Sequence, residues 1–261
     1  MQINKSFVKN FQLNIKNRSA NHQQSIIETI IDYFNETAGC HSEQLGFPLK
    51  LLFTKGYSWV LLSWNIEIDQ LPRNGDKLNI ETWISHTKRC FVFREFLVKS
   101  NDTNIIIRAS SQWVFYNINK KMPVRILYEL ANKWIINSRK ACPSATNKFI
   151  LIENSSFNKI DAKRIAVKSD DIDFLDHVHN SKYINWIFSS KPKTILHNYI
   201  LKKLEIYYLH EIKYPGDVFI KQQSVLLESN KNAVIDDYIW DQQKERIATR
   251  ARSYWNKKRE K

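Results

Sequence analysis

The sequence predicts an α+β protein made of two similar units, each an antiparallel sheet wrapped around a long helix. Two observations lead to this prediction: a helical stripe of apolar residues followed by alternating strands, and the return of the same order of elements in the second half. The 261 residues fit one large or two ordinary domains, and 43% of them are hydrophobic. We therefore expect two domains with well-packed cores.

The first unit is expected to begin with a weak edge strand over residues 7–16, followed by a buried helix. Apolar residues in that helix recur at spacings of three and four, namely Ile27, Ile30, Ile31, Phe34 and Ala38. Alternating residues then predict a strand through Val60, Leu62, Trp64, Ile66 and Ile68. Turn residues at 71–76 and further alternation up to Phe115 predict an antiparallel meander.

Residues 137–163 lack this periodicity and are rich in Ser, Asn and Lys. We predict an N-terminal domain over residues 1–140, a linker over 141–163 and a C-terminal domain over 164–261. An offset of 141 residues places Gly75-Asp76 on Gly216-Asp217 and Gln70 on Glu211. Two copies of one structural unit explain this match, although two unrelated meanders can also align by chance.

The composition limits the classes of function. The formal net charge of +14 favours contact with nucleic acid, an anionic membrane surface or an acidic protein, and it also fits a Lys-, Asn- and Ile-rich genome bias. No Gly-rich phosphate loop and no aromatic–basic repeat is present, which argues against nucleotide or nucleic-acid binding. Three scattered cysteines and no apolar run of about 20 residues predict a cytoplasmic protein without membrane insertion.

The richest cluster of chemical groups lies between residues 170 and 179, which hold four aspartates and two histidines. Asn180 follows as a candidate N-cap, and Tyr183, Trp186 and Ile187 then share one helical stripe that we assign to the core. Backbone N–H groups at a helix start can stabilise an oxyanion, so we expect the chemistry here. Asp170, Asp171 and Asp176 are interpreted as a solvated acidic turn.

Glu211 is the second candidate. By the offset of 141, it lies on one strand face with Tyr207 and Leu209, whose first-half equivalents look core-facing. We therefore expect an apolar environment that raises the pKa of Glu211 and makes it a base near neutral pH. His177 and His179 could instead bind a metal with Asp173, but no further ligand cluster is evident, so we predict neither metal nor cofactor.

These residues resemble the acyl-acyl-carrier-protein (acyl-ACP) thioesterases of bacteria and plant plastids over nearly the whole chain. The segments that match in the first half are Ala38–His41, Trp59–Leu61, Gly75-Asp76, Arg94–Phe96, Ala109–Trp113 and Pro123–Arg125. Those in the second half are Asp173, His177-Val178, Asn180, Tyr183, Trp186, Leu204–Ile206, Glu211, Gly216-Asp217, Ala251-Arg252 and Trp255. The resemblance implies two tandem hotdog domains, with the catalytic residues in the second.

The resemblance assigns catalysis to Asp173, His177 and Glu211, and substrate or oxyanion contacts to Val178, His179 and Asn180. It places the acyl chain along Ile27, Ile31 and Phe34. Two positions depart from the family pattern, because Leu175 replaces the usual Asn and His179 replaces another Asn. Ile212 occupies the position where plant members often have cysteine, which excludes a cysteine nucleophile.

The expected function is hydrolysis of fatty acyl-ACP in fatty acid biosynthesis, with Glu211 activating water or, less favourably, attacking directly. The partners are an acidic, phosphopantetheinylated carrier protein and a fatty acyl thioester, with no nucleic acid; a homodimer is left open. Arg246, Arg250 and Arg252, with Lys257, Lys258, Arg259 and Lys261 beyond them, are a candidate docking face or an ordinary solvated surface. The alternative is an acyl-ACP or acyl-CoA binding hotdog protein weakened or inactivated at Leu175. In the weakened case, Leu175→Asn should raise the rate.

Overall fold

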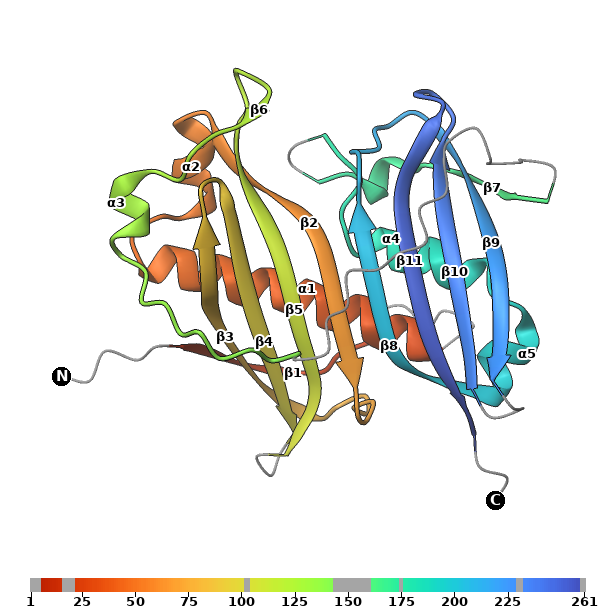
Figure 1. Ribbon diagram of the computed structural model, residues 1–261. Coiled ribbons are helices and arrows are strands. Elements are labelled where there is room, and N and C mark those ends of the chain that lie inside the picture. The colour runs from red at the N-terminus through yellow and green to blue at the C-terminus, as the bar shows by residue number, and fades with distance from the viewer. Residues whose placement is uncertain are drawn as a thin grey trace. The chain divides into compact units, whose positions relative to one another are not determined.

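A computed structural model describes residues 6–15, 22–100, 104–142, 161–173, 176–228 and 232–258. The packing divides them into two compact units. The first holds residues 6–15 and 29–142, and the second holds residues 22–28 and those from 161 onwards. Each unit contains an antiparallel sheet and helical residues (Figure 1), which confirms the predicted α+β class. No helix in the described part of the chain is long and apolar enough to cross a membrane.

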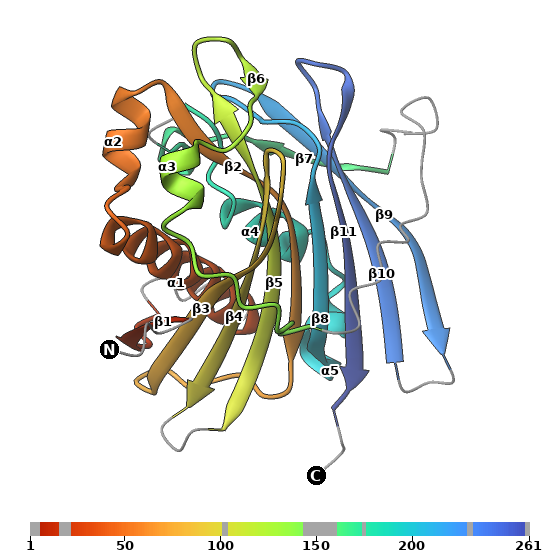
Figure 2. The same ribbon diagram turned by 60° about the vertical axis from the view of Figure 1, so that its left-hand side comes forward.

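The sheet of the first unit has the strand order β1-β3-β4-β5-β2, with β6 paired to β5 (Figure 2). The strands are β1 (Phe7–Gln12), β2 (Tyr57–Ile68), β3 (Lys77–Lys88), β4 (Phe91–Ser100), β5 (Ile105–Asn117) and β6 (Met122–Pro123). The predicted alternation holds for Trp64, Ile66 and Ile68, which are buried. It fails at Val60 and Leu62, because the register with β5 shifts after Leu61 and turns Leu61 inward instead.

The predicted stripe lies on the 23-residue helix α1 (His22–Gln44). Ile27, Ile30, Ile31 and Phe34 are completely buried, as the spacing predicted. Within the first unit, the ring of Phe34 lies 4.6 Å from that of Phe96 and 5.4 Å from that of Trp64. The helix therefore packs on the inner face of the first sheet.

Residues 134–142 cross the opposite face of this sheet as a strap. The indole N–H of Trp83 donates to the carbonyl of Arg139 (2.8 Å), whose guanidinium lies 4.0 Å from the ring. The buried carboxylate of Glu95 accepts bonds from Lys140 Nζ (3.1 Å) and the N–H of Ala141 (3.0 Å). The first residues of the predicted linker, 141 and 142, are thus packed on the first unit.

Two short helices close one end of the first sheet. They are α2 (Leu49–Thr54) and α3 (Tyr128–Ala131). Leu52 and Leu130 are buried in one cluster with Phe115 and Ile126. This small second core fixes both helices at the end of the sheet where β2 begins and β5 ends.

The sheet of the second unit has the order β8-β11-β10-β9-β7. The strands are β7 (Lys163–Ala166), β8 (Tyr199–Tyr208), β9 (Asp217–Glu228), β10 (Asn232–Asp241) and β11 (Arg246–Lys257). Helix α4 (Lys182–Ser189) buries Tyr183, Trp186 and Ile187, as predicted for a core stripe, and Phe188 packs edge-on against Trp255.

The helix of the second unit is shorter than predicted. The helix α4 has eight residues, and α5 (Lys193–Asn198) has six. Pro192 separates them because a proline disfavours helical backbone in the residue before it. Lys191 therefore turns inward, where its side chain and that of Asp237 form an ion pair with no exposed surface. The prediction of a long helix in each unit is correct only for α1.

Candidate active site

The acidic segment of the second unit folds into a small hairpin. Ile172 and Val178 form an antiparallel bridge, and the N–H of Asp173 donates to the carbonyl of His177 (2.8 Å). Asp176 lies in the turn with a φ of 61°, a left-handed conformation that aspartate tolerates better than most residues. The hairpin therefore holds Asp173 and His177 next to each other.

One backbone hydrogen bond joins this hairpin to the segment after β8. The N–H of Val178 donates to the carbonyl of Ile212 (2.9 Å), one residue beyond Glu211. The backbone of Ile212 also forms a hydrogen bond with the hydroxyl of Tyr183, which is buried on α4. His177 and Glu211 consequently lie close enough for each charge to shift the pKa of the other. The structure thus brings together these two predicted residues, which are 34 positions apart in the sequence.

Asp173 supports His177 through the backbone. Its Oδ1 accepts a hydrogen bond from the N–H of His177 (3.2 Å), in addition to the bond in the opposite direction. Its charge also raises the pKa of His177. These two bonds fix the backbone of His177 beside Asp173.

His177 is half-buried, and its burial lowers its pKa. The carboxylates of Glu211 and Asp173 act in the opposite direction but only partly offset the desolvation, and Lys213 lowers the pKa further. The imidazole is therefore neutral at neutral pH. A neutral imidazole has one N–H donor and one acceptor nitrogen, so it can both donate to a carbonyl and exchange a proton.

Glu211 differs from its predicted environment. The strand β8 ends at Tyr208, Leu209 is 41% exposed and the Glu211 side chain is 50% exposed. Partial burial raises its pKa, but its own backbone N–H, Lys244 and His177 together outweigh this, so the pKa lies below the ordinary value. Lys244 Nζ lies 3.4 Å from Glu211 Oε1. The prediction of an apolar strand face and a raised pKa is wrong.

A one-residue error in the predicted offset explains this failure. The N–H groups of Asp69 and Gln70 both bond to the carbonyl of Ile106, and those of Leu209 and His210 both bond to that of Ala248. These strand ends correspond at an offset of 140, as do the buried pairs Leu61 and Leu201, Trp64 and Leu204, and Ile66 and Ile206. A slip of one residue exchanges the two faces of a strand.

The predicted oxyanion residues surround the start of α4, but their main chain is largely engaged. The N–H of Val178 bonds to Ile212, and that of His179 bonds to the carbonyl of Asp171 (2.8 Å). The carbonyl of Asn180 accepts from Tyr208 Oη (3.1 Å). Because a backbone N–H has one hydrogen, the oxyanion role of the Val178 and His179 N–H groups is wrong.

The cap of α4 also differs from its prediction. The N-cap residue is buried Ser181 and not Asn180, and its Oγ lies 2.9 Å from Nδ1 of His179. Sequence reasoning missed Lys244 as well, because the turn between β10 and β11 carries no signal for proximity to Glu211. Among the described residues, no group of three His, Cys, Asp or Glu side chains is placed to hold a metal.

The remaining predicted residues lie elsewhere. Ile27, Ile31 and Phe34 are completely buried on α1, and Leu175 lies outside the described residues.

A surface groove of about 720 Å³ in the first unit runs over Asn10–Gln12, Lys77–Asn79 and Lys99–Ser100, and holds none of the predicted site residues. Asp170 and Asp176 are exposed and Asp171 is half-buried, which largely agrees with the predicted solvated acidic turn.

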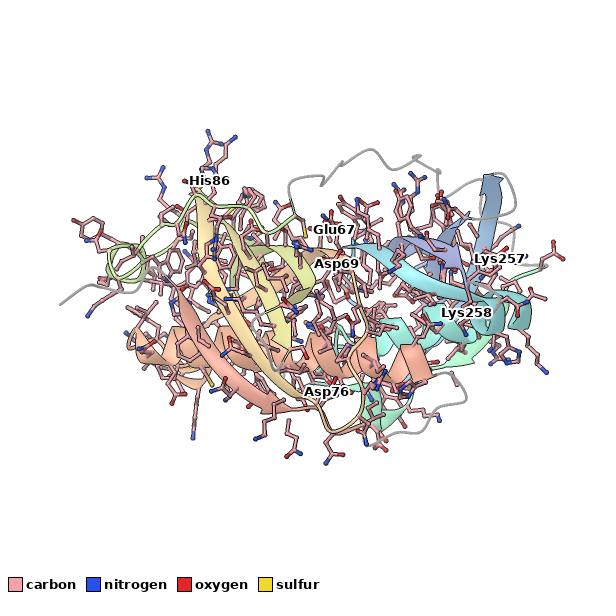
Figure 3. All side chains as sticks on the ribbon, turned by 90° about the horizontal axis from the view of Figure 1, so that it is seen from below. Glu67, Asp69, Asp76, His86, Lys257 and Lys258 are labelled. Atoms are coloured by element: carbon pink, nitrogen blue, oxygen red, sulfur yellow. The ribbon has the colours of Figure 1, made fainter. Side chains whose placement is uncertain are left out.

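The cationic residues near the C-terminus do not form one uniform face. Arg252 makes two hydrogen bonds to Asp236 (2.6 and 2.7 Å), so its charge is neutralised within the sheet. Arg246 and Arg250 are half-buried. Lys257 and Lys258 are exposed at the end of the chain's last strand (Figure 3). These last two are the fully exposed members of the predicted set among the described residues, and Arg259 and Lys261 lie outside the described residues.

Comparison with known families gives matches to both halves of the chain. The model for the acyl-ACP thioesterase N-terminal domain matches residues 4–134, and the model for the C-terminal domain matches residues 154–257. A chloroplastic palmitoyl-acyl carrier protein thioesterase of Gossypium hirsutum is 28% identical over 87% of this chain. A chloroplastic oleoyl-acyl carrier protein thioesterase of Coriandrum sativum is 25% identical over 74% of it. The alignments span only 57% and 56% of these relatives.

Solved structures share the fold over almost the full chain. A putative oleoyl thioesterase from Lactobacillus plantarum has a TM-score of 0.83 at 22% identity, with 98% of this chain and 97% of the other covered. A 12:0-ACP thioesterase from Umbellularia californica has a TM-score of 0.80 at 20% identity, with 99% and 100% covered. The resemblance noted from the sequence is thus confirmed, including its fold.

Proposed function

Because the chain belongs to the acyl-ACP thioesterase family, we propose that it hydrolyses the thioester of fatty acyl-ACP and releases the free fatty acid. The single observation that supports this most directly is the contact between the hairpin of His177 and the segment of Glu211. The proposal includes a role in fatty acid biosynthesis and a cytoplasmic location, with which three free cysteines are consistent.

Glu211 activates the attacking water. Its pKa lies below the ordinary glutamate value, so the side chain is a carboxylate at neutral pH and can accept a proton. Its 50% exposure gives water access, and the ion pair with Lys244 holds its charge in place. The low pKa makes it a weaker base than the sequence suggested, so positioning of the water contributes more than basicity.

His177 acts on the other side of the thioester. As a neutral imidazole, it donates its N–H to the carbonyl oxygen while water forms the new C–O bond. When the C–S bond breaks, the leaving thiolate of the carrier's arm takes up the proton that water gave up. Asp173 holds His177 by two backbone hydrogen bonds, and this keeps the imidazole directed at one position.

Residues beside this pair bind the substrate. The side chains of His179 and Asn180 border the start of α4 and contact the arm near the thioester, while buried Val178 supports the hairpin. Ile27, Ile31 and Phe34 line the path of the acyl chain, which requires the apolar core around α1 to open for it. The macromolecular partner is an acidic, phosphopantetheinylated carrier protein. Measurement of the molecular mass in solution tests whether the protein forms a homodimer.

The test is incubation of the purified protein with acyl-ACPs of several chain lengths and measurement of free fatty acid. We expect turnover by the native protein and a loss on the order of a hundredfold or more in Glu211→Gln. Asp69→Asn, at the corresponding strand end of the first unit, is the matched control and should leave turnover unchanged. Binding of acyl-ACP without release would instead identify an acyl-binding protein.

A further inference from the structure

The antiparallel order of the first sheet gathers three connections at one end. The strand β2 begins, β3 ends, β4 begins and β5 ends there, so residues 47–57, 86–90 and 117–134 are neighbours. Two hydrogen bonds join them, from the N–H of Ile118 to Gly56 O (2.8 Å) and from the N–H of Ile126 to Arg89 O (3.2 Å). We call these three segments the basic end.

The basic end holds eight basic residues and one acidic residue, Glu129. The eight are Lys50, Lys55, Lys88, Arg89, Lys120, Lys121, Arg125 and Lys133. All eight are exposed, and no ion pair joins any of them to an acidic residue in the described part of the chain. Their net contribution of +7 is half of the formal charge of the whole chain, +14.

One connection at the opposite end of the same sheet has a different charge. The connection between β2 and β3, residues 69–76, carries Asp69, Arg73 and Asp76 and is net acidic. Figure 3 shows His86 at the basic end and Asp69 and Asp76 toward the other end of the strands. A general excess of lysine in the composition does not explain this difference between two ends of one sheet.

Large apolar side chains are exposed at the same place. Nine such side chains are exposed in the described part of the chain, and five of them belong to the basic end: Leu49, Leu51, Phe53, Met122 and Tyr128. Tyr128 is the most exposed of all nine, at 77%. Single exposed apolar residues are ordinary, but a cluster of this size indicates a contact surface.

A layer of buried apolar side chains packs beneath the exposed residues of the basic end. Leu52, between two exposed residues of α2, is buried together with Ile126 and Leu130. The exposed side chains therefore stand on a packed layer and cannot turn inward without breaking it. Their exposure is a fixed property of this end of the sheet.

We propose that the basic end docks on a membrane surface that contains anionic lipids. Leu, Phe, Met and Tyr side chains enter the boundary between headgroups and acyl chains, while long lysine and arginine side chains keep their charges at the phosphates. Anionic headgroups supply the complement to eight unpaired basic side chains. This surface goes beyond the proposed hydrolysis and does not depend on it.

Two other polyanions fit less well. Single-stranded nucleic acid is bound by basic grooves with stacked aromatic rings, whereas leucine and methionine predominate here. An acidic carrier protein would complement the basic side chains, but a folded partner would also have to fit apolar side chains from three separate connections. A bilayer requires no shaped complement, so it accepts apolar and basic side chains that come from three separate connections.

The test is flotation of the full chain with vesicles of phosphatidylcholine alone or mixed with phosphatidylglycerol. We expect binding to the mixed vesicles and a reduction on the order of a hundredfold in Lys50→Gln/Lys55→Gln/Lys121→Gln. Leu51→Ser/Phe53→Ser/Tyr128→Ser should reduce binding by about tenfold or more. The matched controls Arg73→Gln/Lys77→Gln/Lys193→Gln and Val8→Ser, at exposed sites elsewhere, should bind as the native chain does.

The proposal is overturned by no binding to mixed vesicles at low salt, by equal losses in the control variants, or by full binding of the apolar triple variant. Turnover of acyl-ACP in lipid-free buffer is measured in parallel. If the lysine triple variant raises the Michaelis constant for acyl-ACP and binds vesicles normally, the surface belongs to the carrier protein and the membrane assignment is wrong. Loss of turnover in Glu211→Gln tests the hydrolase proposal separately.

Discussion

The two units contain the same succession of strands but differ in what lies at the end of the equivalent strands β2 and β8. In the first unit, Asp69 pairs with Arg108, and a turn leads directly to β3. In the second, the chain passes through Glu211 to Ile212, whose carbonyl accepts a hydrogen bond from the hairpin of Asp173 and His177. The hairpin precedes a helix of only eight residues, whereas α1 has 23. A shorter helix thus distinguishes the candidate catalytic unit from the other, and the hairpin before it carries two of the candidate residues.

The largest effect is expected from His177. Replacement with Ala removes the donor to the thioester carbonyl and should lower kcat on the order of a thousandfold. His86→Ala, at an exposed position of the first unit, should leave kcat unchanged. Steady-state kinetics with acyl-ACP measures both. If His177→Ala and His86→Ala lower kcat by the same small factor, the two units are not functionally distinct.

The next effect concerns stability. Asp237→Ala leaves the buried ammonium of Lys191 without its partner and should lower the free energy of unfolding by about 3–5 kcal/mol. Asp69→Ala breaks an exposed ion pair in the first unit and should cost less than about 1 kcal/mol. Urea unfolding of both variants gives the comparison. A loss below that of Asp69→Ala would show that Lys191 reaches solvent.

A smaller effect is expected from Lys244. The ammonium of Lys244 helps hold the pKa of Glu211 below its ordinary value, so Lys244→Met should let that pKa rise. Because activity requires the carboxylate, the acid limb of kcat/KM should move to higher pH. The relative loss of rate should grow as the pH falls below about 5 and should be small at about pH 7.5. A pH profile that does not move would mean that another group sets the acid limb.

The smallest effect concerns the carrier protein. Higher salt should raise the Michaelis constant for acyl-ACP by a few-fold and leave that for a short neutral thioester unchanged. The predicted docking cations differ in their environment, since Arg252 binds Asp236 whereas Lys257 and Lys258, among the described members of the set, are exposed. Equal responses of the two substrates would exclude electrostatic steering.

The parts of the fold that depend on periodicity were predictable. The stripe of α1, the alternation in β2 after Leu61 and the buried face of α4 follow directly from apolar spacing. The length of the second helix was not predicted, although Pro192 was a visible signal for its end. The bulge at Leu61 has no comparable signal, because it depends on pairing with β5.

The candidate site was predictable in its residues and less so in its environment. His177 and Glu211 were found from residue type and resemblance, and the structure brings them together. The pKa of Glu211 was mistaken because a repeat offset derived from Gly-Asp turns was wrong by one residue at the strand end. Lys244 could not be found, because its proximity to Glu211 is created by the closing of the β10–β11 turn on the end of β8.

The bond between the Val178 N–H and the Ile212 carbonyl is made entirely by main-chain atoms. Substitutions other than proline at Val178 leave the donor and the acceptor in place, so the alignment of the two segments tolerates changes in their side chains. Insertion or deletion of one residue between Glu211 and β9, or within the hairpin, shifts the donor past the acceptor. The spacing of the chain, more than its chemistry at these two positions, therefore controls whether imidazole and carboxylate face each other.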